Sequence, residues 1–155
     1  MNMRRFHLGD VLSITADRLV SPRHTSGVHD ILNFMSGESL FTHQLGRVVK
    51  ECAPYLLKQF PGLDSPQMQF ALGELVEMLK TPSGKKDPEK LVTEWMSKVI
   101  SGKYGINLPL CGEYKNMLDV ERLPPDVHER IDPKSELAER FHPDRITELK
   151  IIRTC

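Results

Sequence analysis

Side chains able to titrate near neutral pH are concentrated at the start of this chain. Four of its six histidines fall within the first 43 residues, namely His7, His24, His29 and His43. The same third holds Asp10, Arg18, Arg23, Arg47 and Cys52. Because histidine gains or loses its proton near physiological pH, this density favours proton transfer, metal binding or anion binding. The spacing of the residues must decide among these three.

The loop from Ser21 to Ser26 is the best candidate for a site, and its chemistry suits an anion. Hydroxyl, guanidinium and imidazole groups lead into the start of a predicted helix, where free backbone N–H groups and the helix dipole favour a phosphate or carboxylate. The candidate anion-binding residues are Arg23, His24, Ser26 and His43. The alternative is structural: Ser26 caps the helix, while Arg23 and His24 hold the loop against carbonyls or an acidic side chain.

Metal binding and nucleophilic catalysis are less well supported. His24 and His29 are five residues apart, whereas two ligands on one helix face need a separation of three or four. Cys52 falls on the apolar side of its predicted helix, where a cysteine behaves as a small core residue. The sequence also lacks a glycine-rich phosphate loop. We therefore predict no catalytic residue, no metal ligand and no cofactor.

A strand and two helices should position the first third of the chain. Partial alternation of apolar residues predicts a strand over residues 6–15, with a bulge or turn at Gly9-Asp10. A helix should begin after an N-cap at Thr25 or Ser26 and end at Gly37; its apolar face is formed by Val28, Ile31, Leu32 and Met35. A further helix over residues 43–59 should be kinked or split at Pro54.

Residues 65–102 predict a helical hairpin inserted into the fold. Ser65-Pro66 and Asp87-Pro88 each supply an N-cap followed by proline at the first helical position. Trp95 lies on the apolar face of the second helix, so we expect it to pack inward. Residues 103–133 then carry three proline-bearing turns, which are typical of an extended strap on a domain surface.

The end of the chain completes an α+β prediction. A short helix is expected over residues 137–141, and the β-branched run at residues 146–152 is suited to pair with the N-terminal strand. Such a fold has a helical majority, a small antiparallel sheet near the termini and the hairpin as an insertion. At 155 residues, the chain has the length of a single domain, residues 1–155.

Composition narrows the possible partners. The 21 basic residues balance the 21 acidic ones, so the net charge does not indicate binding to nucleic acid. The three cysteines are widely separated, which argues against a disulfide framework and favours a reducing cytoplasm. No stretch approaches the roughly 18 apolar residues of a membrane span. We therefore expect a cytoplasmic protein that does not act at a membrane.

Several segments of the sequence resemble an uncharacterised group of small proteins encoded by bacteriophages and prophages. The segments are FHLGDVLSIT, RLVSPRH, GVHDILNFMSG, LFTHQLGR and LPPDVHERIDP. The resemblance is close over residues 6–60 and loose over residues 95–140, while residues 62–90 resemble an expansion beyond the usual length. It implies a viral or prophage origin and a host bacterial cytoplasm as the location, and it transfers no catalytic residue.

Two classes of function follow from these observations. In the first, a phage or prophage accessory protein binds a host or viral macromolecule stoichiometrically, as a counter-defence, anti-CRISPR-like inhibitor would. Tyr104, Tyr114 and Arg122 are the candidate partner-binding residues, because tyrosine and arginine are common at interface hot spots. In the second, a small enzyme or nucleotide-binding protein uses the Arg and His residues of the first third. We expect the first class, and a shared cavity for those residues would favour the second.

Overall fold

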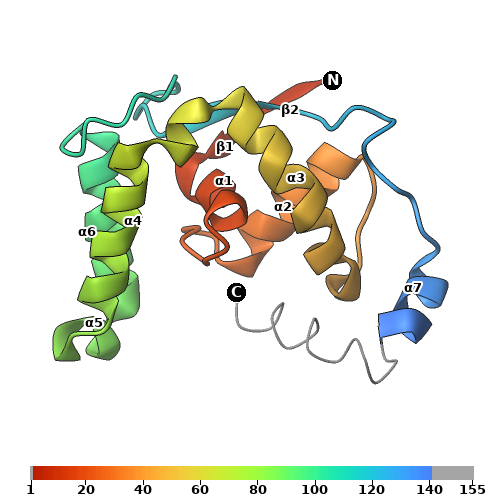
Figure 1. Cartoon of the computed structure of the whole chain (residues 1–155), viewed down its shortest axis with the longest axis horizontal. Coiled ribbons are helices and arrows are strands. Elements are labelled where there is room, and N and C mark those ends of the chain that lie inside the picture. Colours follow the sequence, from red (N-terminus) through yellow and green to blue (C-terminus); the bar gives the residue numbers. More distant parts are fainter. Residues whose placement is uncertain (1, 141–155) are drawn as a thin grey trace.

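Three helices and a two-stranded sheet form the centre of the computed structural model, which describes residues 2–140 (Figure 1). The chain begins with β1 (Met3–His7) and α1 (Leu8–Thr15), and then forms α2 (Thr25–Ser36) and α3 (Leu45–Gln59). Short 3₁₀ turns, η1 (Thr42–Gln44) and η2 (Pro61–Asp64), flank α3. The predicted α+β class with a helical majority and a small antiparallel sheet is confirmed.

The strand predicted over residues 6–15 is wrong beyond His7. Leu8, Val11 and Leu12 recur at helical spacing, and all three are fully buried, so α1 presents them to the core as one face. His7 caps this helix, since its Nδ1 accepts a hydrogen bond of 2.9 Å from the backbone N–H of Gly9. Strand and helix therefore meet without a loop, which fixes β1 against α1.

The sheet joins the start of the chain to a segment from its last third. β1 pairs in antiparallel fashion with β2 (Met117–Glu121), from Met3 opposite Glu121 to His7 opposite Met117. The segment predicted as an extended strap, residues 103–133, thus supplies the partner of β1. The partner proposed from the sequence, residues 146–152, lies outside the described residues.

The next two helices follow the predicted boundaries closely. α2 ends at Gly37, which has a φ of +71° and so adopts the left-handed conformation that glycine tolerates. Its N-cap is His24 rather than Thr25 or Ser26, and His24 makes no side-chain capping bond. α3 runs without interruption through Pro54, so the prediction of a split at this residue is wrong.

The hydrophobic core lies between these three helices and one face of the sheet. Alternation along β1 and β2 directs Phe6, Leu118 and Val120 to that face, and all three are buried. They pack with apolar side chains of the helices, among them Leu8, Leu12, Ile31, Leu32, Val48, Cys52 and Leu56. The core therefore fixes the position of β1 and of the first turns of α1 and α2.

The remaining helices lie at the two ends of the molecule (Figure 1). α4 (Pro66–Leu79), the short α5 (Pro82–Lys86) and α6 (Pro88–Ile100) form the predicted hairpin, with Ser65 and Asp87 as N-caps. Trp95 is buried between its helices and donates a hydrogen bond of 2.8 Å to the carbonyl of Ala71.

At the opposite end lies α7 (Pro133–Arg140), which starts four residues before the predicted helix. Asp132 precedes it and accepts a hydrogen bond of 3.2 Å from the backbone N–H of Ser135. Within residues 2–140, the helices are all too short or too polar to cross a membrane.

Candidate functional site

The start of α2 is occupied by an acidic side chain of the protein itself. Asp10, on α1, is fully buried and accepts hydrogen bonds from the hydroxyl of Ser21 and, at 2.6 Å, from the guanidinium of Arg23. A Cβ added to Gly27, in the first turn of α2, would collide with Asp10 and Ser21. Glycine at this position thus lets the carboxylate approach the helix terminus, where the dipole stabilises negative charge. The place at which we predict a bound anion thus holds the carboxylate of Asp10, as in the structural alternative.

Arg23 joins two carboxylates. Its Nη1 donates to Asp30, on α2, at 3.0 Å, and its Nη2 donates to Asp10 at 2.6 Å. The hydrogen bond to Asp10 is the main reason why the pKa of Arg23 is raised. Arg23 therefore plays the structural part considered in the sequence analysis, holding its loop to acidic side chains.

Asp30 also binds an arginine from the sheet. Both terminal amino groups of Arg4 donate to its carboxylate, at 3.0 and 2.9 Å. Burial alone would raise the pKa of Asp30, but the hydrogen bonds from Arg4 and Arg23 outweigh it, and the pKa lies below its ordinary value. The Arg4 guanidinium also stacks over the ring of Phe6, at 4.7 Å from the ring centre.

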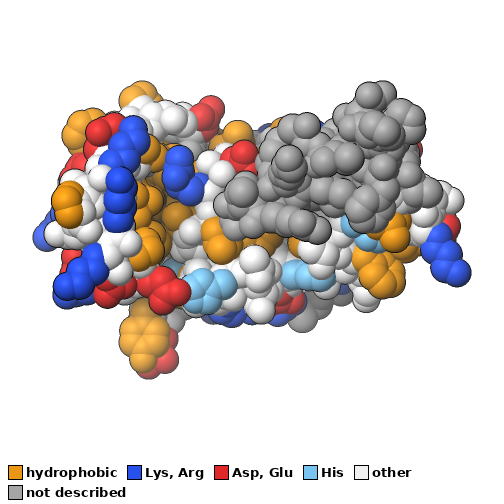
Figure 2. Space-filling model, turned by 90° about the horizontal axis from the view of Figure 1, so that it is seen from below, with side chains coloured by type: hydrophobic (Ala, Val, Ile, Leu, Met, Phe, Trp, Pro, Cys, Tyr) orange, Lys and Arg blue, Asp and Glu red, His pale blue; other side chains and the backbone are white. Residues whose placement is uncertain are grey.

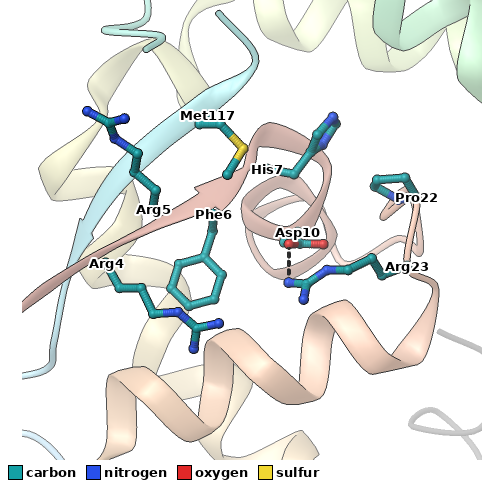
Figure 3. Close-up of a pocket in the computed structure, with 8 residues that line it drawn as sticks. All are labelled: Arg4, Arg5, Phe6, His7, Asp10, Pro22, Arg23 and Met117. Carbon is teal, nitrogen blue, oxygen red and sulfur yellow. Dashed lines mark hydrogen bonds and ion pairs between the residues drawn. The ribbon is translucent and has the colours of Figure 1, made fainter. Parts of the chain in front are cut away.

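Arg5 extends to the other side of β1. Its Nε donates to Asp119, on β2, at 3.0 Å. Figure 3 shows Arg4 and Arg5 leaving the strand on opposite sides, with Arg23 approaching Asp10 from the loop after α1. These side chains are well exposed, at 47% for Arg4, 57% for Arg5 and 46% for Arg23. Three guanidinium groups are thus ordered by ion pairs yet accessible to solvent.

A pocket of about 380 Å³ lies among these arginines (Figure 3). It is lined by Arg4, Arg5, Phe6, His7, Asp10, Pro22, Arg23 and Met117. Residues from both faces of β1 line it, so the pocket lies along the free edge of this strand. Burial lowers the pKa of His7, which keeps its ring neutral while Nδ1 caps α1.

A fourth arginine continues this surface beyond β2. Arg122 stacks over the ring of Phe34 at 4.9 Å, and Phe34 in turn packs against Phe6 with ring centres 5.5 Å apart. Since Arg4 stacks over Phe6, the Phe6 and Phe34 rings together lie between the guanidinium groups of Arg4 and Arg122. We call Arg4, Arg5, Arg23 and Arg122 the arginine surface.

The four residues predicted for an anion site are not brought together. His24 lies outside the pocket, with Nε2 at 3.5 Å from Glu89 of α6, and Ser26 is exposed on the first turn of α2. His43 belongs to η1, where its Nε2 bonds the carbonyl of Pro133 at 2.8 Å. Histidine side chains also appear as separate spots on the face shown in Figure 2. Of the predicted set, only Arg23 lines the pocket.

The predicted partner-binding residues also lie apart. Tyr104 follows α6 and packs edge-on against Phe70 of α4, with ring centres 6.4 Å apart. Tyr114 is exposed in the turn before β2, whereas Arg122 follows the other end of that strand. Only Arg122 contributes to the arginine surface.

Cys52 is a core residue, in agreement with its sequence pattern. Its thiol is fully buried, and burial raises its pKa to about 12. Across residues 2–140, acidic, histidine and cysteine side chains form no group arranged to hold a metal ion.

A second polar cluster, at the end of α2, has no counterpart in the sequence predictions. His128 lies between two carboxylates, with Nε2 against Glu38 and Nδ1 at 2.6 Å from Glu51. Next to it, Arg47 donates to Glu136 of α7 at 2.9 and 3.1 Å. We call these residues the C-terminal clamp, because they attach the segment before α7 and α7 itself to α3. The bonds that attach the C-terminal segment join residues 77 to 90 positions apart, so no local pattern could have revealed the clamp.

Comparison with known proteins assigns no activity to this arrangement. Residues 6–65 match the family model described as a domain of unknown function (DUF7736). No curated protein and no solved structure gives a significant match. The matched stretch runs from Phe6 in β1 to Ser65, the N-cap of α4, and so includes Asp10 and Arg23 but not the hairpin.

Proposed function

We propose that this protein is a phage- or prophage-encoded accessory protein that binds a host or viral protein stoichiometrically, through its arginine surface. The observation that carries the proposal is the ordering of exposed arginines: Asp30 holds Arg4, Asp119 holds Arg5, and Phe34 supports Arg122. Arginine is a frequent hot-spot residue, and a side chain that is already ordered loses little entropy on binding.

The remaining reactive groups support binding rather than turnover, because they are already engaged within the fold. The His7 ring caps α1, since its Nδ1 accepts from the N–H of Gly9. Cys52 has too high a pKa to form a nucleophilic thiolate near neutral pH. The alternative function, binding of a nucleotide or small anion in the pocket, would require the anion to compete with Asp30 for Arg4 and Arg23.

The resemblance to phage- and prophage-encoded proteins supports a partner in the cytoplasm of a bacterial host. Inhibition of a host antiviral machine, in the manner of anti-CRISPR proteins, is the form of this function that we propose. Such an inhibitor acts by occupying a surface, for which a small protein without a catalytic centre is sufficient.

The test begins with capture of the partner from host cells by the full chain, with Arg4→Glu as a matched variant. A partner retained by the wild type and lost by the variant is then purified and its activity titrated with the full chain. We expect inhibition to saturate near equimolar protein. A full effect at a small fraction of the partner's concentration would show turnover, and equal capture by the variant would exclude the arginine surface.

A further inference from the structure

β1 has an unpaired outer edge within the part of the chain that the structure describes. Arg122 N–H donates to the carbonyl of Asn2, and Leu8 N–H donates to that of Asn116, so even-numbered residues of β1 face β2. The N–H and C=O groups of Met3 and Arg5 therefore point away from β2. In residues 2–140 they bond no other group.

The outer edge of β2, in contrast, is bonded at both of its ends. At one end, the backbone of Met117 forms two hydrogen bonds with Cys111, of 2.8 and 3.1 Å. At the other end, the side-chain amide of Gln59 accepts from the N–H of Glu121 at 2.9 Å and donates to its carbonyl at 3.4 Å. The protein's own groups thus bond the outer edge of β2 at both ends, whereas the described chain bonds neither Met3 nor Arg5 at the outer edge of β1.

We propose that the open edge of β1 takes up an extended, acidic segment of a protein partner as an additional strand. This proposal rests on the proposed function and names its partner chemistry. The edge offers donors and acceptors in alternation, which a peptide backbone matches. A phosphodiester backbone has acceptors only and would leave the carbonyls of Met3 and Arg5 unpaired.

The positive charge of Arg5 beside the edge favours an acidic residue on the added strand. Arg5 uses its Nε for Asp119, which leaves its two terminal amino groups without a carboxylate in the described structure. A glutamate directly opposite Arg5 on an added strand would project on the same face and accept from them. A second copy of β1 would instead bring arginine against arginine, which disfavours self-pairing.

A peptide of alternating glutamate and threonine, blocked at both ends, is a suitable probe for the full chain. Before addition, amide hydrogen exchange should be fast at Met3 and Arg5 and slow at Arg4 and Phe6. The peptide should slow exchange at Met3 and Arg5, and a matched peptide of alternating lysine and threonine should not. An oligothymidylate that binds without protecting these amides, while the acidic peptide does not bind, would assign the arginines to phosphate and overturn the proposal.

Methylated peptides test the backbone bonds without any change in the protein. When glutamate is opposite Arg5, its N–H faces β1, so N-methylation of the glutamates should abolish binding, whereas methylation of the threonines should preserve it. Arg5→Pro should also abolish binding, because it removes an N–H that the added strand would bond. The β1–β2 ladder does not use this N–H, so the sheet itself should remain. Equal binding of both methylated peptides would overturn strand addition and leave stoichiometric binding, which the titration above tests separately.

Discussion

Two polar clusters flank α2, and they use the same kinds of side chain in different ways. At its start, Arg4 and Arg23 share Asp30, and Arg23 also reaches the buried Asp10. At its end, Arg47 of the C-terminal clamp binds Glu136 and Glu51. Both clusters join segments distant in the sequence, but they differ in exposure.

The C-terminal clamp is closed to solvent. Arg47 is 17% exposed, and Glu136 and His128 are each 5% exposed. Arg47 also donates to the carbonyl of Glu129, at 2.5 Å, so its guanidinium is shared among several acceptors. The side chains of Arg4 and Arg23, at the start of α2, are 47% and 46% exposed, and within residues 2–140 Arg5 bonds a carboxylate through its Nε alone. The comparison teaches that the exposure of the side chains, rather than residue type, distinguishes a structural cluster from a binding surface.

The largest effect should come from opening the C-terminal clamp. Arg47→Ala leaves the buried Glu136 without its guanidinium, and breaking a buried ion pair from one side costs about 3–5 kcal/mol. Chemical denaturation should therefore show a large loss in the free energy of unfolding. A cost below about 1 kcal/mol, as for an exposed pair, would remove the distinction between the two clusters.

A smaller loss should follow from changing Asp10, the buried member of the first cluster. Asp10→Asn keeps the shape but removes the charge from the bonds to Ser21 and Arg23, and a hydrogen bond to a charged group contributes roughly 1.5–3 kcal/mol. The measurement is again the free energy of unfolding. Unchanged stability would show that the carboxylate at the start of α2 is not a structural anion, and would reopen that place for a ligand.

The pH dependence of stability should reveal the neutral ring of His7. Its pKa in the folded chain lies below the ordinary value of 6.5, so as the pH falls through 6.5 the unfolded chain takes up a proton that the folded chain does not. Stability should therefore decrease in this range. In His7→Asn, which retains a capping side chain, the decrease should be smaller. Identical pH profiles of unfolding would contradict this account of His7.

How much of the structure can be predicted from the sequence depends on how far apart along the chain the residues lie that form each feature. The hairpin could be predicted because its caps, Ser65 and Asp87, act on their own helices. The pairing of Arg23 with an acidic side chain could be considered from the sequence as an alternative, but its partner Asp10 could not be identified, because it comes from a different helix. The strand predicted over residues 6–15 failed at Leu8, where alternation and helical spacing share several positions.

Other features depend on contacts that no local pattern encodes. The partner of β1 lies more than 100 residues further along the chain, in a segment whose prolines indicate a strap. The open edge of β1 is a property of the whole fold. It depends on whether any other described segment bonds the outer backbone groups of Met3 and Arg5, as Cys111 and Gln59 bond those of β2.

The smallest effect on stability is expected at Arg5. Its ion pair with Asp119 is well exposed, and such pairs contribute little to folding because water and salt screen them. Arg5→Ala should therefore unfold at the same denaturant concentration as the wild type, within the error of the measurement. A clear shift of this midpoint would place Arg5 among the structural residues.

The central claim is tested most directly by measuring stability and partner binding on the same preparations of Arg5→Ala and Arg47→Ala. The partner is the protein captured by the wild type, and binding is measured by calorimetric titration under conditions in which both variants are folded. We predict that Arg5→Ala keeps the wild-type free energy of unfolding and loses affinity for the partner. Arg47→Ala should have a lower free energy of unfolding and keep its affinity for the partner. The reverse pattern would contradict the account, because it would make the arginine surface structural and the C-terminal clamp the site of binding.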